Sequence, residues 1–72
     1  MLWLKKNKYY TVGIQYNLFG TSDLVIGWGN VYNKLGNHKI IPLDNADVLP
    51  KVIAQITKRR KARKYALVRD TL

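Results

Sequence analysis

The chain has 72 residues, of which 47% are hydrophobic, so it is too apolar for a disordered segment, yet no apolar run reaches the roughly 18 residues of a membrane span. Thirteen Lys and Arg residues oppose four acidic ones, and the resulting net charge of +9 favours a polyanionic partner such as nucleic acid. The absence of cysteine and the single histidine, His38, exclude disulfides, thiol nucleophiles and the usual zinc sites.

The first half of the chain has the two-residue periodicity of β-strands. Residues 2–4 predict a short edge strand, and residues 9–16 alternate between two faces over a longer one. Residues 20–23 have the composition of a turn, and the alternation resumes over residues 24–32. We therefore expect a β-hairpin, with a small strand preceding it.

A third strand is expected after a loop. Residues 33–38 contain glycine and asparagine, which accept the backbone conformations of loops. The apolar segment that follows, residues 40–43, predicts a strand that ends at Pro42, since proline has no N–H for a sheet.

An amphipathic helix is expected next. Asp47 is suited to be the N-cap, and Pro50 then falls in the first turn, where its missing N–H costs nothing. An apolar stripe with helical spacing faces the sheet and consists of Leu49, Val52, Ile53 and Ile56.

Six cations are concentrated at the end of this helix, in residues 58–64. Arg59 and Arg63 share a helix face, and Arg60 points roughly 100° around the helix from Arg59. Two interpretations remain open: a solvated helix end that complements the helix dipole, or a phosphate-binding surface that relieves the mutual repulsion of the cations. Residues 65–68 are apolar again and predict another edge strand.

These elements predict a single α+β domain over residues 1–72, with an antiparallel sheet of four to five strands packed against one helix. At the N-terminus the charges follow a short apolar patch, the reverse of a secretory signal. We therefore expect a cytoplasmic protein.

Short motifs along most of the chain match one known family in order and spacing. They are Asn7-Lys8-Tyr9-Tyr10, Leu18-Phe19-Gly20, Trp28-Gly29, Pro42-Leu43-Asp44, and Lys64-Tyr65 with Leu67 and Asp70. In this pattern the chain resembles the WGR domains, named for Trp-Gly-Arg in a strand of a small sheet packed on one helix. The family includes small bacterial proteins and the module beside the catalytic domain of DNA-dependent poly(ADP-ribose) polymerases, where it binds DNA ends. The resemblance implies nucleic-acid binding without catalysis, with DNA ends or breaks as the preferred target.

Trp28 lies between two glycines, which leave space around it. The strand pattern places Trp28 on the face of Leu24 and Ile26 and so favours a core position, whereas the resemblance implies an exposed ring that stacks on a base or sugar. The signature arginine is replaced by Asn30, whose amide lacks the charge and the bidentate fork of a guanidinium. The phosphate contacts must then come from elsewhere.

The predicted nucleic-acid-binding residues combine cations, aromatic rings and amides. They are Asn7, Lys8, Trp28, Asn30, Lys34, Lys39, Arg59, Arg60, Arg63 and Tyr65. For Asn7 and Lys8 a role in a turn is an equal alternative, and for Tyr65 the alternative is packing against the sheet edge. His38 is interpreted as a loop residue. The four aspartates are scattered along the chain, so we expect no catalytic residue, metal or cofactor.

Two other functions fit the same composition. The first is a protein-interaction module that docks an acidic partner on the sheet surface. The second is an RNA-binding or ribosome-associated basic protein, since clustered cations and stacking aromatics serve RNA equally well. The sequence is silent on the oligomeric state.

Overall fold

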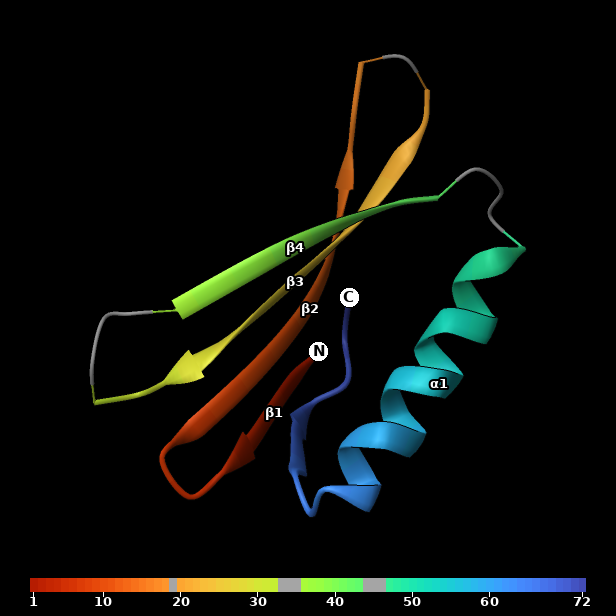
Figure 1. The fold of residues 1–72 in the computed structure, drawn as a ribbon. Coiled ribbons are helices and arrows are strands. Elements are labelled where there is room, and N and C mark those ends of the chain that lie inside the picture. Colours follow the sequence, from red (N-terminus) through yellow and green to blue (C-terminus); the bar gives the residue numbers. More distant parts are fainter. Residues whose placement is uncertain (19, 33–35, 44–46) are drawn as a thin grey trace.

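The computed structural model describes residues 1–18, 20–32, 36–43 and 47–72, which form one helix and one five-stranded antiparallel sheet (Figure 1). The elements in chain order are β1 (Leu2–Lys5), β2 (Lys8–Tyr16), β3 (Ser22–Asn30), β4 (Gly36–Leu43), α1 (Val48–Ala62) and β5 (Ala66–Arg69). Across the sheet the order is β4-β3-β2-β1-β5, so the last strand pairs with the first. The expected α+β fold, an antiparallel sheet against a single helix, is confirmed.

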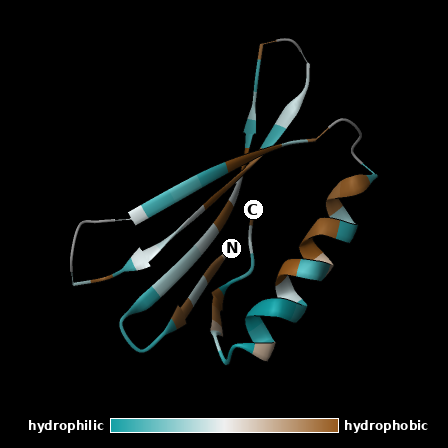
Figure 2. Cartoon of the chain, viewed as in Figure 1, coloured by the Kyte–Doolittle hydropathy of each residue, from teal (hydrophilic) through white to brown (hydrophobic). Residues whose placement is uncertain are grey.

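The β2–β3 hairpin determines which side chains face α1. Val12 pairs with Ile26, and Ile14 pairs with Leu24, so these four side chains share one face of the sheet. The buried core on this face consists of Val12, Leu24, Ile26 and Leu43. The predicted apolar stripe of α1 packs against that core, whereas the last turns of the helix are hydrophilic (Figure 2).

β1 lies inside the sheet, between β2 and β5, and the prediction of an edge strand was wrong. Its Trp3 is fully buried and pairs with Tyr10 on one side and Leu67 on the other. The Met1 amine donates hydrogen bonds of 2.6 Å to the carbonyl groups of Val12 and Thr71. Burial of this amine lowers its pKa, and the nearby Arg69 lowers it further. A strand so short gives no sign of a partner more than 60 residues away, which is why the sequence pattern missed its position.

β4 is longer than predicted at its start and is not interrupted by Pro42. It begins at Gly36, so His38 and Lys39 belong to a strand and not to a loop; residues 33–35 lie outside the described part of the chain. β4 forms an edge of the sheet, where a proline without an N–H is tolerated. Its exposed, polar first half has no apolar alternation to reveal it.

β3 ends at Asn30, two residues before the predicted end, because the backbone bends there. The Val31 N–H donates to the Asn7 carbonyl at 2.7 Å, and the Tyr32 N–H donates to the Asn30 side-chain oxygen at 2.8 Å. The Tyr32 side chain that follows this bend is 85% exposed. At its other end β3 starts at Ser22, inside the predicted turn.

The glycines on either side of Trp28 make room for side chains on the face of the sheet opposite α1. A Cβ atom added at Gly29 would lie 2.9 Å from the Tyr9 hydroxyl, and one added at Gly36 would lie 2.5 Å from it. At Gly27 the added atom would lie 2.9 Å from the Thr11 hydroxyl. The glycines therefore let the Tyr9 ring lie flat across β3 and β4.

The helix of the described chain lacks the length and the apolar composition needed to span a membrane.

Replacing Leu24 with alanine should lower the free energy of unfolding by about 2–5 kcal/mol, because it leaves a cavity in the core. Urea denaturation followed by circular dichroism measures this change. Ile40→Ala is the matched control: Ile40 is 52% exposed on β4, and its loss should change the free energy by about 0.5 kcal/mol or less. Equal effects of the two substitutions would contradict the assignment of the core.

Candidate nucleic-acid interface

A groove runs from the space between α1 and the sheet to the end of the β2–β3 pair, and two of the adjoining cavities along it are lined by Trp28. The first, which we call the basic cavity, has a volume of about 300 Å³ and is lined by Tyr10, Ile26, Trp28, Lys39, Arg59, Arg60, Arg63 and Tyr65. The second, the strand-end cavity, has a volume of about 240 Å³ and is lined by Lys8, Tyr9, Trp28, Gly29, Asn30 and Tyr65. No acidic residue is among these described lining residues, so the groove has a positive potential.

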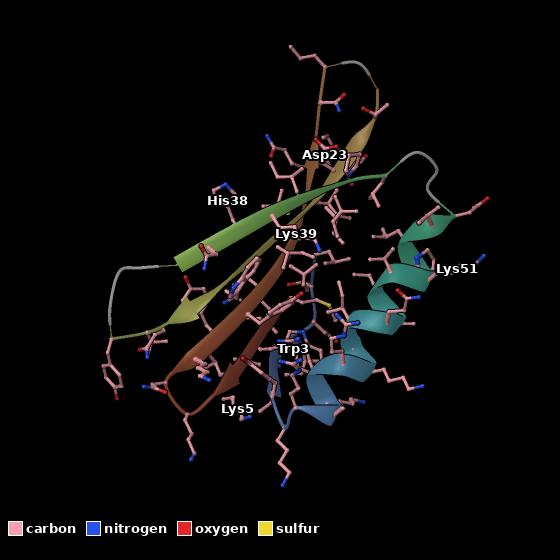
Figure 3. The ribbon with its side chains drawn as sticks, viewed as in Figure 1. Trp3, Lys5, Asp23, His38, Lys39 and Lys51 are labelled. Carbon is pink, nitrogen blue, oxygen red and sulfur yellow. The ribbon has the colours of Figure 1, made fainter. Side chains whose placement is uncertain are left out.

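Strand register brings the sheet residues of the groove together. Tyr10 of β2 pairs with Trp28 of β3, and Lys8 pairs with Asn30. On the other side of β3, Lys39 pairs with Ile26 and so points to the same face. Figure 3 shows His38 and Lys39 leaving β4 in opposite directions, with Lys39 on the side of α1. Alternation along three adjacent strands therefore places two rings and two cations on one side.

Arg60 is the central side chain of the groove. Its guanidinium carbon lies 4.1 Å from the centre of the Tyr10 ring and 4.9 Å from the centre of the Tyr65 ring. Only 8% of the residue is exposed, and its Nε has no hydrogen-bond partner among the described residues. Two cation–π contacts, each worth about 0.5–2 kcal/mol, offset part of the cost of burying this charge.

The burial of Arg60 departs from the expectation of three arginines on a solvent-facing helix end. Arg60 follows Ile56 by four residues and Ile53 by seven, so it continues the sheet-facing stripe. The helical spacing of Arg60 from Ile56 and Ile53 therefore indicates a position facing the sheet, but arginine is a charged residue and was grouped with the exposed cations. Arg59 and Arg63 are exposed as expected, and both line the basic cavity.

The end of α1 positions Tyr65. The Tyr65 N–H donates to the Arg60 carbonyl at 3.0 Å, and Lys64 before it has a positive φ of 63°. This turn brings the chain back beneath the helix, and the Tyr65 ring packs between Arg60 and Lys5, whose Nζ lies 5.8 Å from the ring centre. The ring thus contacts α1 and β1 and also lines both cavities, so both interpretations of Tyr65, packing and a nucleic-acid contact, stay predictions.

Trp28 is half-buried and combines the two positions that the sequence left open. It packs against the core cluster, and it also lines both cavities of the groove. Among the described aromatic residues, the cation–π contacts involve Tyr10 and Tyr65 and not Trp28.

The remaining predicted residues lie at the end of the β2–β3 pair or outside the groove. Lys8 is exposed and lines the strand-end cavity with Asn30, whose side-chain oxygen also holds the bend at Tyr32. The Asn7 carbonyl holds the same bend, and Asn7 does not line the two cavities. Lys34 lies outside the described residues.

Sequence reasoning did not predict Tyr10, which lines the basic cavity, or Lys5, which lines neither cavity but contacts the Tyr65 ring. Tyr10 was detectable, because the predicted hairpin places it on the face that carries Trp28. Lys5 was not, because its contact with Tyr65 depends on the pairing of β1 with the end of the chain. No group of three His, Cys, Asp or Glu residues that could hold a metal ion occurs among the described residues.

A double-mutant cycle tests the Arg60 contact. Arg60→Met keeps an apolar stem but removes the charge, and Tyr65→Leu removes the ring. The free energies of unfolding of the two single variants and the double variant should give a coupling of about 0.5–2 kcal/mol. The control pairs Lys51→Met with Tyr65→Leu: Lys51 is an exposed residue near the start of α1, and its coupling should stay within about 0.5 kcal/mol. A coupling for Arg60 no larger than the control would contradict the contact.

Comparisons of the chain with models of protein families, with curated proteins and with solved structures found no match. The resemblance to the WGR domains therefore remains a prediction based on the motifs themselves.

Proposed function

We propose that this chain is a non-catalytic nucleic-acid-binding module that uses the groove between α1 and the sheet. The observation that carries the proposal is the basic cavity, where Arg59 and Arg63 on the helix and Lys39 on β4 surround the half-buried ring of Trp28. Cations bind phosphates irrespective of sequence, and an accessible aromatic ring binds a base or sugar. The described lining contains no carboxylate that would repel a polyanion.

The cations contribute in two ways. The net charge of +9 attracts nucleic acid over a distance and accelerates its association. At the groove, Arg59, Arg63 and Lys39 release counterions from the phosphates they neutralise, which makes binding favourable at low salt. Arg60 adds a charge that is shielded from water and so acts through a lower effective dielectric constant.

DNA ends or breaks are the preferred target, and this preference rests on the resemblance to WGR domains around Trp28-Gly29. RNA is the alternative nucleic acid. A cytoplasmic location belongs to the same proposal.

Equilibrium binding tests the proposal. Labelled blunt duplex DNA, nicked duplex, single-stranded DNA and RNA are titrated with the protein, beside polyglutamate as an acidic polypeptide of similar charge. Binding to nucleic acid at least tenfold tighter than to polyglutamate supports the proposal. Equal affinity for polyglutamate would instead support the module that docks an acidic protein.

The salt dependence of binding should identify the phosphate contacts. Each neutralised phosphate contributes about −0.9 to the slope of log affinity against log salt for duplex DNA. The double variant Arg59→Gln, Arg63→Gln should therefore flatten the slope by about 1.8. The control variant Lys6→Gln, Lys51→Gln removes the same charge from exposed residues that line neither cavity, and its slope should change by less than half as much. Equal flattening by the two variants would contradict the groove as the binding site.

Restoring the signature arginine, Asn30→Arg, should tighten DNA binding about tenfold, because a charge-assisted bond to phosphate is worth about 1.5–3 kcal/mol. The substitution places a second cation opposite Lys8 and removes the acceptor of the Tyr32 N–H, so it should also destabilise the fold slightly. Titration of labelled DNA at fixed salt measures the gain. His38→Arg adds the same charge on the opposite face of the sheet and is the control; an equal gain there would show a non-specific charge effect.

A further inference from the structure

The basic cavity and the strand-end cavity meet at a pair of aromatic residues. Among the described residues, Trp28 and Tyr65 line both the basic cavity and the strand-end cavity. Each cavity is lined by its own polar side chains. They are Arg59, Arg63 and Lys39 in the basic cavity, and Lys8 and Asn30 in the strand-end cavity. A ligand that follows the groove therefore passes the Trp28 ring and meets cations both before and after it.

Trp28 differs from the other two rings of the basic cavity. The guanidinium of Arg60 covers Tyr10 and Tyr65, and the ammonium group of Lys5 approaches Tyr65 as well. No described cation stacks on Trp28, although this residue is only half-buried. The ring that remains available for stacking is therefore the one at the junction of the two cavities.

Arg60 supplies an independent sign of an anionic ligand. It lines the basic cavity, yet it is more than nine-tenths buried, and its Nε has no partner among the described residues. Burial of a charge without a counterion is costly, and two tyrosine rings offset that cost only in part. An anion in the basic cavity would complete the compensation.

The size of the cavities favours single nucleotides over base pairs. Their volumes of about 300 and 240 Å³ lie at or below the lower end of the range for small-molecule sites, about 300–1,000 Å³. Within a duplex the faces of the bases are stacked on one another and the backbones lie outside, so a ring inside a groove cannot reach them; at a blunt end only the outer face of the terminal base pair is exposed. An unpaired strand exposes its bases and can follow the groove.

We propose that the groove binds an unpaired polynucleotide strand, with consecutive nucleotides in the two cavities and one base stacked on Trp28. The phosphate of the first nucleotide is neutralised by Arg59, Arg60 and Arg63, and that of the next by Lys8. The inference rests on the proposed function and narrows its target from DNA ends or breaks to unpaired nucleotides, whether they occur at an end, at a break or in RNA. Two nucleotides are the minimal ligand. Unpaired strands occur in DNA and RNA, so the chemistry they share defines the ligand.

The experiment compares ligands of increasing length. Thymidine 5′-monophosphate, the phosphorylated dinucleotide and strands of four and eight thymidines are titrated at low salt. The comparison ligands are an eight-nucleotide uridine strand and a blunt DNA hairpin whose loop is a non-nucleotide linker, so that every base of the hairpin is paired. We expect about a tenfold gain in affinity from one nucleotide to two, a gain below about threefold from two to four, and weaker binding of the hairpin than of the eight-nucleotide strand. The uridine strand shows whether the site accepts both DNA and RNA.

Variants locate the bound strand. Trp28→Ala should weaken binding of the thymidine strand by about 5- to 150-fold, the effect of losing one stacked base, and change binding of the hairpin less than twofold. Tyr16→Ala is the control, since Tyr16 is a tyrosine with 78% exposure that lines neither cavity. Circular dichroism checks that each variant is folded.

A measurement on the unaltered protein covers the case in which Trp28→Ala fails to fold. The protein has two tryptophans, and Trp3 is fully buried, so a collisional quencher such as acrylamide acts on Trp28. A saturating thymidine strand should reduce that quenching at least twofold, whereas the hairpin should leave it unchanged.

The outcomes separate the inference from the proposed function. If the hairpin binds as tightly as the strand, or if the strand leaves the quenching of Trp28 unchanged, the inference is overturned and nucleic-acid binding stands. If neither strand nor hairpin binds at low salt, the proposed function fails, and the inference fails with it.

Discussion

The stacking of Arg60 between Tyr10 and Tyr65 is the contact on which the C-terminal part of the fold depends. It joins three elements that are far apart in the sequence: α1, β2 and the turn that leads into β5. The core cluster holds the first turns of α1, but the apolar stripe ends at Ile56, and beyond that point the helix approaches the sheet through a guanidinium. A planar cation suits this position, because it packs flat against rings and keeps its edge polar.

Because Arg60 and not an apolar side chain joins the end of α1 to the sheet, the hydrophobic core stops short of this end, and a groove remains there. Chains of this size bury only about 60% of their unfolded surface and are correspondingly marginal in stability. Here part of the contact area between helix and sheet is lined by cations that repel one another. Any anion that binds the folded state and not the unfolded chain will therefore raise the apparent stability by mass action. The cations that line the groove therefore affect both the stability of the fold and the binding of an anion.

The sequence predicted the elements whose signals are local. Alternation over β2 and β3 and the helical stripe of α1 depend on neighbours within a few residues, and those elements were found in nearly their observed positions. Pairing of β1 with β5 is not local, and the exposed first half of β4 lacks alternation, so both were misjudged. The predicted fold class is nevertheless correct, because the number of strands and the single helix are sufficient to define it.

The candidate site was predictable to the same extent. Trp28, Lys39, Arg59 and Arg63 line the groove. The expected strand and helix periodicities place Trp28, Arg59 and Arg63 on the correct faces, whereas Lys39 lies before the strand that the sequence predicted. Arg60 was judged by its charge, although its spacing from Ile56 already placed it towards the sheet. The stack that it forms with Tyr65 depends on the sharp turn at Lys64, whose positive φ no pattern of lysines and arginines reveals.

The order of the sheet, β4-β3-β2-β1-β5, also determines when the groove can form during folding. The β2–β3 hairpin closes a short loop, whereas β5 joins β1 only after nearly the whole chain has been gathered, and such a closure carries a larger entropic cost. Tyr65 immediately precedes β5. The side of the groove that Tyr65 lines is therefore completed only when β5 pairs with β1, the last strand pair to form. The same strand is the natural first unit to detach in a local opening, with the β2–β3–β4 meander and its core intact. In hydrogen exchange, amides of β5 should accordingly lose protection before those of the hairpin.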